Sequence, residues 1–541
     1  MSIADDVVRE WESENADAQN MMTLYQSVAD HFFPNQNTIT VSRTDGEDKS
    51  LPILDPTGML DFQKMSAGMV AVILPQGQNF FRLASSDYEQ NNNDRIRGIL
   101  NQYTMMVNQA MLQSNFPTEL SQYLKALTGF GTGNLYSGFD VDDMKLYYKN
   151  WFPQCYRFCE DKYGTPNRCI IRWQYTARQA YELWGDDAGE KIADIMKSDE
   201  SKANQKFWFL FRVAKNKDRN PQYSDNKNYK FKEVIVNESE KSKVAENGYE
   251  TFPYHISRWL LASQEKWGRG QGTIALSADK ELQVQYKALN LNADLANNPP
   301  RETLSSFEGT PKVYPGANNI VMEANSIRAL DRTLQGNFPI TKDLLEMHRE
   351  IVHECFFIRV FAPLDNLPGD RRTTVEIIER VKAGYIQLIE PVTRIYTEGL
   401  SPCIVRTFHM LLKNGLLPPP PPELRSLKIE YLGRLALALQ EQQADALQRF
   451  SQFAINMESV MPNFLTDNIN VDRAGRRMAT TFGVNEGDFN TEDERDAIRQ
   501  QRAQAQQAQM EMEAMQSMGK AYKDGSTAPE QGSPAGMLMN E

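Results

Sequence analysis

The sequence of 541 residues lacks most of the patterns that catalytic chemistry requires. No G-x-x-x-x-G-K-[ST] loop is present to hold a nucleotide phosphate, and no G-x-S-x-G turn is present to expose a nucleophilic serine. Histidine is rare, with five in the chain. His348 and His353 are five residues apart, whereas two zinc ligands on one helix face are four apart. We therefore expect a structural protein with no catalytic residue, metal site or cofactor.

Cysteine and long apolar runs are also scarce. The five cysteines form no Cys-x-x-Cys pair, which favours reduced thiols, and we interpret Cys155, Cys159 and Cys169 as small buried residues of a β region. The acidic N-terminus has no apolar core of the kind found in signal peptides. The longest apolar run, AGMVAVIL before Pro75, is too short to cross a bilayer. These features predict a soluble intracellular protein without a membrane partner.

Positive charge is in deficit, since 59 lysines and arginines face 71 acidic residues and leave a net charge of −12. A protein that grips nucleic acid broadly needs an excess of basic residues to neutralise phosphates. Any contact with DNA should therefore be local or weak.

Helical and β-rich segments alternate along the chain, which predicts an α+β, mainly helical fold. The first 130 residues have helix periodicity, with one helix from about Val7 to Phe33. A second helix has Asp55 as its N-cap and Pro56 as its first residue. Residues 135–261 carry aromatic and β-branched runs separated by turn residues, which indicates a mostly β insert.

The second half returns to helices. A glycine-rich stretch, WGRGQGT, is interpreted as a flexible elbow before a helix that runs to Asn297. Helices resume from 340 to about 413, with a bend expected at Pro391, and a stiff polyproline connector follows. Two further helices are predicted near 434–458 and 472–482, before a Gln- and Met-rich tail that is an exposed helix or a disordered segment.

The helix over 281–297 has two apolar sides. At about 100° per residue, one side carries Leu282, Tyr286, Leu289, Ala293 and Ala296, and the opposite side carries Val284, Ala288, Leu291 and Leu295. An ordinary surface helix buries one stripe. Two opposed stripes indicate either a stave that packs against neighbours on both flanks of a barrel, or the middle helix of a layered helical domain.

A short loop interrupts the helices at 362–372. It contains Asp365, Asp370, Arg371 and Arg372, and Thr373 begins a Thr-x-x-Glu pattern that caps the next helix. The break is therefore encoded in the sequence.

Several motifs in this order resemble the portal, or head-to-tail connector, proteins of short-tailed bacteriophages. The motifs are LPQGQNFFRL, KALTGFGTGNLY, FPYHISRWLLASQEKWGRGQGT and the long segment after the loop that begins RTTVEIIERV. Each is weak alone, and their order over several hundred residues makes the combination fairly specific. The part beyond Asp493 lies outside the secure resemblance.

The resemblance implies a subunit with four kinds of region, assembled into a ring. Carried onto this chain, the regions are a wing at 1–270 with its β-rich insert at about 135–261, a first stem helix at 271–297, a clip at 298–339, a second stem helix at 340–361, a channel loop at 362–372, a long wing helix at 373–415, a crown at 416–490 and a C-terminal tail at 491–541.

The resemblance also implies partners and a location. These are a homo-oligomeric ring, expected to be a dodecamer, through which double-stranded DNA passes without sequence specificity, a terminase motor, a tail adaptor, and the capsid and scaffolding proteins. The ring would assemble in the host cytoplasm and stand at the portal vertex of the virion, where it serves DNA packaging and ejection.

Residue roles follow from the same resemblance. Leu282, Val284, Tyr286, Leu289, Leu291 and Leu295 would pack the stem. In the channel loop, Asp365 and Asp370 would discourage tight phosphate binding, while Arg371 and Arg372 would either contact DNA transiently or pair with carboxylates.

Two other functions stay open from the sequence. One is another virion ring or a tail adaptor, and the other, from a different class, is a nucleic-acid-processing enzyme. The paired helices around a small module favour the portal, and the missing nucleotide and metal motifs count against the enzyme.

Overall fold

The computed structural model describes residues 2–44, 46–47, 53–75, 79–87, 90, 93–198, 200–220, 222–223, 228–297, 301–303, 327–329, 338–361, 384, 386–422, 427–432, 450, 452, 472, 474–475, 490 and 492–525. The chain mixes helices and strands, as predicted. It divides into two compact units: the first comprises residues 1–81, 105–420 and 431–438, and the second comprises 82–104, 421–430 and 439–541.

The N-terminal helix α1 (Ile3–Phe32) starts where its capping residues dictate. Ser2 Oγ accepts a hydrogen bond from the Asp5 backbone N–H at 3.1 Å, and the Asp5 carboxylate accepts one from the Ser2 N–H at 3.2 Å. This reciprocal pair satisfies backbone donors that have no partner inside the helix.

Helix α2 (Thr57–Ile73) begins one residue later than the sequence predicts, because Pro56 occupies the N-cap position. The Asp55 carboxylate still accepts the Thr57 N–H at 2.9 Å. Two more helices of the predicted helical part are α4 (Asp94–Gln113), which passes from the second unit into the first, and α5 (Phe116–Phe130).

Two antiparallel sheets occupy the region for which the sequence predicts a β-rich insert. Their strand orders are β3-β2-β9 and β4-β5-β6-β7-β8. The strands are β2 (Thr132–Asp140), β3 (Lys145–Trp151), β4 (Tyr156–Glu160), β5 (Pro166–Thr176), β6 (Lys206–Lys215), β7 (Phe231–Asn237), β8 (Ser242–Tyr249) and β9 (Tyr254–Arg258).

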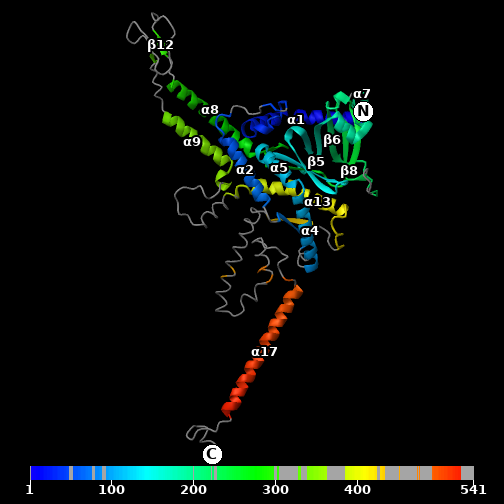
Figure 1. Cartoon of the computed structure of the whole chain (residues 1–541), viewed down its shortest axis with the longest axis vertical. Coiled ribbons are helices and arrows are strands. Elements are labelled where there is room, and N and C mark those ends of the chain that lie inside the picture. The colour runs from blue at the N-terminus through cyan, green and yellow to red at the C-terminus, as the bar shows by residue number, and fades with distance from the viewer. Residues whose placement is uncertain are drawn as a thin grey trace, which may run out of the picture. The chain divides into compact units, whose positions relative to one another are not determined.

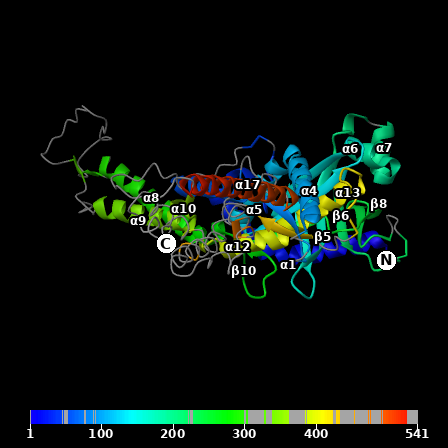
Figure 2. The same cartoon turned by 90° about the horizontal axis from the view of Figure 1, so that it is seen from below.

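The five-stranded sheet is covered on both faces by its own chain. One face packs under the start of α1, in a cluster of Ala4, Val7, Val8, Trp11, Ile170, Leu210, Val234 and Val236. The other packs under α6 (Ala177–Trp184) and α7 (Glu190–Ser198), in a cluster that includes Phe207, Phe209, Ile235 and Val244 (Figures 1 and 2). Double coverage explains much of the apolar run FWFLF in β6, since Phe209 and Leu210 enter opposite cores, whereas Trp208 is 36% exposed.

The glycines of WGRGQGT form a tightly packed junction and not the flexible elbow that was expected. Short strands β10 (Leu260–Leu261) and β11 (Gly268–Arg269) pair just before α8. A Cβ at Gly268 would collide with the carbonyl oxygen of Gly131, and one at Gly270 would lie 2.6 Å from the carbonyl oxygen of Thr128. Gly131 itself has a φ of +100°, a conformation that favours glycine. Two backbones thus meet where only glycine fits.

Two long helices follow this junction and lie side by side (Figure 1). They are α8 (Gln271–Asn297) and α9 (Phe338–Cys355), and between them in sequence β12 (Arg301–Thr303) pairs antiparallel with β13 (Ile327–Ala329). The predicted second stem helix is interrupted after Cys355, where Phe357 has a positive φ of 53°, and α10 (Ile358–Phe361) continues beyond it.

The predicted bend near Pro391 appears as a break just before it. Gln387 and Leu388 form a turn, and α12 (Ile389–Arg394) starts after them. Because Pro391 has no N–H, it cannot donate to the carbonyl of Gln387 four residues earlier. A π-helical turn (Ile395–Leu400) then leads into α13 (Ser401–Lys413).

The second unit holds most of a short two-stranded sheet, together with the C-terminal helix. Strand β1 (Phe81–Ser85) pairs with β14 (Leu427–Tyr431), and Arg82 Nη2 lies 2.6 Å from Glu430 Oε2. The sequence did not predict β14. Helix α17 (Glu492–Gly525) covers the predicted tail helix, and most of its described side chains are exposed.

Candidate subunit-contact surface

The pair of helices α8 and α9 is attached to α1 and α2 through three buried carboxylates. Arg349 donates to Asp55 Oδ2 at 3.0 and 2.8 Å, His31 Nδ1 lies 2.8 Å from Asp279, and His353 pairs with Asp61.

The local environment keeps Asp55 ionised. Burial would raise its pKa, but hydrogen bonds from Thr57 and the ion pair with Arg349 outweigh burial and lower the pKa of the Asp55 carboxyl. A charged Asp55 holds Arg349 in place. In addition, Gln283 donates to the Asp55 carbonyl at 2.8 Å, so both long helices reach the same residue.

The two apolar stripes of α8 have different environments. Leu282 is fully buried, and Tyr286 and Leu289 are half-buried, so this stripe faces the chain's own helices. Val284 and Leu291 on the opposite stripe are 60% and 58% exposed. The Leu295 side chain lies outside the described residues. One flank of the predicted stave is thus covered, and the other is open.

Helix α9 carries an open apolar stripe that the sequence reading missed. Leu344, Met347 and Ile351 are exposed, Met347 by 50%. Their i, i+3, i+7 spacing places them on one helix face. The signal was present in the sequence, but the same spacing is expected for a buried face, so it did not reveal exposure.

The predicted channel-loop residues Asp365, Asp370, Arg371 and Arg372 lie outside the described residues. So do most of the clip and most of the crown. Their roles remain predictions.

The cysteines for which the sequence predicts small buried residues have different environments in the structure. Cys169 is buried, as expected, but Cys159 is half-buried and pairs with Glu14, so it does not behave as a plain apolar residue. In the described part of the chain, no three His, Cys, Asp or Glu side chains gather as a metal site would require. None of the helices in that part is long and apolar enough to span a bilayer.

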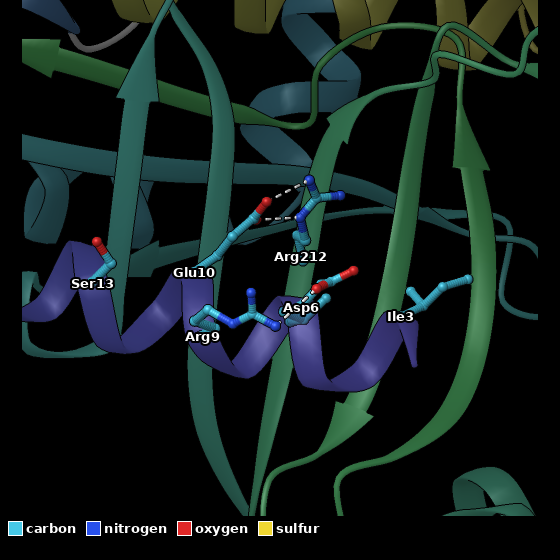
Figure 3. Close-up of a pocket in the computed structure, with 7 residues that line it drawn as sticks. Ile3, Asp6, Arg9, Glu10, Ser13 and Arg212 are labelled. Atoms are coloured by element: carbon cyan, nitrogen blue, oxygen red, sulfur yellow. Dashed lines mark hydrogen bonds and ion pairs between the residues drawn. The ribbon is translucent and has the colours of Figure 1, made fainter. Parts of the chain in front are cut away.

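A groove of about 460 Å³ lies beside the start of α1 (Figure 3). Its lining comprises Ile3, Asp6, Val7, Arg9, Glu10, Ser13 and Arg212. Arg212 donates to both oxygens of Glu10, at 2.6 and 3.1 Å, and Arg9 lies 3.2 Å from Asp6. The two arginines of the groove therefore compensate the charges of Glu10 and Asp6, and one of them, Arg212, projects from strand β6 of the sheet.

Comparison with known proteins places this geometry in a family. Residues 4–489 match the bacteriophage head to tail connecting proteins. The chain belongs to this family. It is 24% identical over 509 residues to a probable portal protein of Bordetella phage BPP-1, covering 92% of this chain and 91% of that protein. It is 25% identical over 528 residues to the portal protein of Salmonella phage epsilon15, covering 94% and 93%.

Family membership confirms the predicted function as a portal, or head-to-tail connector, protein that acts in DNA packaging. Connector proteins of this family are structural components of the phage particle.

Proposed function

We propose that the chain is the subunit of a closed ring, expected to be a dodecamer, whose central channel passes double-stranded DNA during packaging and ejection. The observation that carries the proposal is the open apolar flank of α8. Val284 and Leu291 are exposed in the single chain, although aliphatic side chains gain about 1.5–3 kcal/mol each on full burial. Contiguous exposed apolar residues mark a surface that another protein covers.

In this ring, α8 and α9 form the stem, and the segment between them forms the clip. The wing comprises residues 1–270 and the helices after 373, and the crown follows the polyproline connector. The clip would meet the terminase motor and later the tail adaptor, and the capsid and scaffolding proteins would surround the wing. The ring stands at the portal vertex of the virion after assembly in the host cytoplasm.

Contact with DNA in this proposal is weak and independent of sequence. The net charge of −12 limits phosphate binding, and Arg371 and Arg372 supply local positive charge between Asp365 and the helix that follows. A channel that held DNA firmly would stall its passage.

Electron microscopy of the purified full-length chain tests the ring. We expect annular particles with a central hole, whose mass is a multiple of the subunit mass. Compact monomers across a range of protein and salt concentrations would contradict the proposal. A variant with Arg371→Ala and Arg372→Ala separates assembly from DNA handling: we expect rings of unchanged size and a loss of DNA packaging or retention. Loss of the ring would instead assign the two arginines to subunit contacts.

A further inference from the structure

Helices α8 and α9 expose charged stripes of opposite sign. On α8, Lys280 and Lys287 are exposed, and neither takes part in an ion pair among the described residues. Because they are seven residues apart, both lysines lie on the same side of the helix. The α8 stripe is therefore basic from Lys280 to Lys287, and the exposed Asp294, seven residues further on, follows it towards the end of the helix.

On α9, four exposed carboxylates follow one another along one side. They are Asp343, Glu346, Glu350 and Glu354. Glu346 pairs with Arg349 at 2.9 Å, and Arg359 lies 2.9 Å from Glu350 and 3.9 Å from Glu354. Arg349 is also committed to Asp55, so the stripe keeps a surplus of negative charge.

Both charged stripes lie on the same side of the helix pair. Gln283 and Arg349 reach Asp55 and so mark the side that faces α2. Passing around α8 from Gln283, the lysines come first and the open apolar residues come next. Passing around α9 from Arg349, the carboxylates come first and the open apolar residues come next. Around both helices, the side that faces α2 is therefore followed first by the charged residues and then by the open apolar stripe.

The two open apolar stripes lie on opposite outer flanks of the pair. Val284 lies about 160° around α8 from the buried Leu282, and Met347 lies about 160° around α9 from the buried Leu345. The buried residues face the chain's own helices, so each open stripe points away from them. No single face of the pair contains both stripes.

The lysines of α8 and the carboxylates of α9 also lie at corresponding positions along the helix axes. Gln283 and Arg349 meet at Asp55, and the two helices run in opposite directions with a rise of about 1.5 Å per residue. Lys287, four residues beyond Gln283, therefore lies level with Leu345 and Glu346. Lys280, three residues before Gln283, lies level with Val352, between Glu350 and Glu354.

We propose that α8 of one copy packs on α9 of the next copy around the ring, at equal height. Val284 and Leu291 then cover Leu344, Met347 and Ile351, while Lys287 faces Glu346 and Lys280 faces Glu350. This head-to-tail contact deepens the ring proposed above and rests on it. Packing of α8 on α8 would place lysine opposite lysine, so the charges select a heterologous contact that repeats around a closed ring.

A mixing experiment on the full-length chain tests the pairing. One variant carries Lys280→Glu and Lys287→Glu, and the other carries Glu346→Lys and Glu350→Lys. Each variant alone opposes like charges at every contact, so half-maximal assembly should need at least about tenfold more protein than the wild type. Mixed one to one, each variant meets the other with opposite charges on both flanks. Mass photometry should then show rings of alternating subunits at wild-type concentration.

Controls separate folding from assembly. A variant with Lys206→Glu and Lys217→Glu has the same change in charge at exposed positions of the β-rich insert and should form rings as the wild type does. Thermal unfolding of each variant shows that the subunit is folded, and Glu346→Gln with Glu350→Gln gives a milder version without new charge, which should weaken assembly less than the lysine pair.

Two results would overturn the pairing: rings from either charge-reversed variant alone at wild-type concentration, or a mixture that assembles no better than its parts. Absence of rings from the wild type would instead refute the ring itself.

Discussion

The five-stranded sheet and the α8–α9 pair are both built on apolar stripes, but only the sheet closes them within one chain. Helix α1 covers one face of the sheet, and α6 and α7 cover the other. In α8, Leu282 is buried, whereas Val284 two residues later is 60% exposed. The difference shows that apolar periodicity identifies a surface whose burial is favourable. It does not identify the polypeptide that buries this surface. Substitutions in the sheet should act on folding, and substitutions on the open flanks should act on assembly.

Phe209→Ala in the closed sheet should have the largest effect on folding. Phe209 is fully buried on β6, against Trp184 and Tyr175. Truncation leaves a cavity and should lower the free energy of unfolding by about 3–5 kcal/mol. Urea unfolding of the subunit, followed by tryptophan fluorescence, measures this. A loss below about 1 kcal/mol would show that α6 and α7 do not close the sheet tightly.

Arg349→Ala should also destabilise the subunit, at the point where α9 is attached to the start of α2. It leaves the buried Asp55 carboxylate without its ion pair, which we expect to cost about 2–3 kcal/mol. Arg359→Ala is a matched control, because its pairs with Glu350 and Glu354 are exposed and should contribute less than about 0.5 kcal/mol. Equal effects of the two substitutions would contradict the anchoring role of Asp55.

Acid should weaken the three-stranded sheet through His255 on β9. Burial, with a smaller contribution from the charge of Arg406, lowers the pKa of His255 to about 3. In the unfolded chain the pKa of histidine is about 6.5. Between these values the unfolded chain binds a proton that the folded chain does not, so the free energy of unfolding should fall by about 1.4 kcal/mol for each unit of decreasing pH. Urea unfolding at pH 7.5, 5.5 and 4.5 measures the loss, which should be small above pH 6.5 and approach the full slope below it.

His255→Gln tests this assignment, because glutamine does not titrate and retains a donor and an acceptor for Ser137 Oγ, which lies 2.8 Å from Nε2. The variant should have a shallower slope over the same range. An unchanged slope would assign the acid sensitivity to other groups.

The sequence predicted the parts that local patterns determine. The two stripes of α8, a helix over about residues 7–33 and the β-rich region were all accessible from periodicity and turn residues, whereas the Ser2 cap that starts α1 at Ile3 was not predicted. The glycines at 268–272 were misread as an elbow, because no local pattern reveals that Gly131, more than 130 residues earlier, approaches them. Strand β14 was missed, since its five residues LKIEY gain strand structure through pairing with β1. The asymmetry of α8 depends on which partner covers each flank and was not predictable from one helix.

Val284→Asp combined with Leu291→Asp should have the smallest effect on folding and still abolish the ring. Both residues are exposed in the subunit, so the free energy of unfolding should change by about 0.5 kcal/mol or less. In the proposed ring the same positions are buried, where an unpaired carboxylate is unfavourable. Leu289→Asp is a poorer choice, because Leu289 is half-buried against its own chain and the change would disturb the subunit itself.

Leu282→Ala is the matched variant to compare with this double variant, in both folding stability and ring formation. Leu282 is fully buried in the subunit, so its truncation should cost about 2–5 kcal/mol of folding free energy while leaving the open flank intact. At a temperature where both variants are folded, Leu282→Ala should still form rings, and the double variant should sediment as a monomer of wild-type stability. The reverse result, with rings from the double variant and none from folded Leu282→Ala, would move the subunit contact to the flank that the single chain already covers.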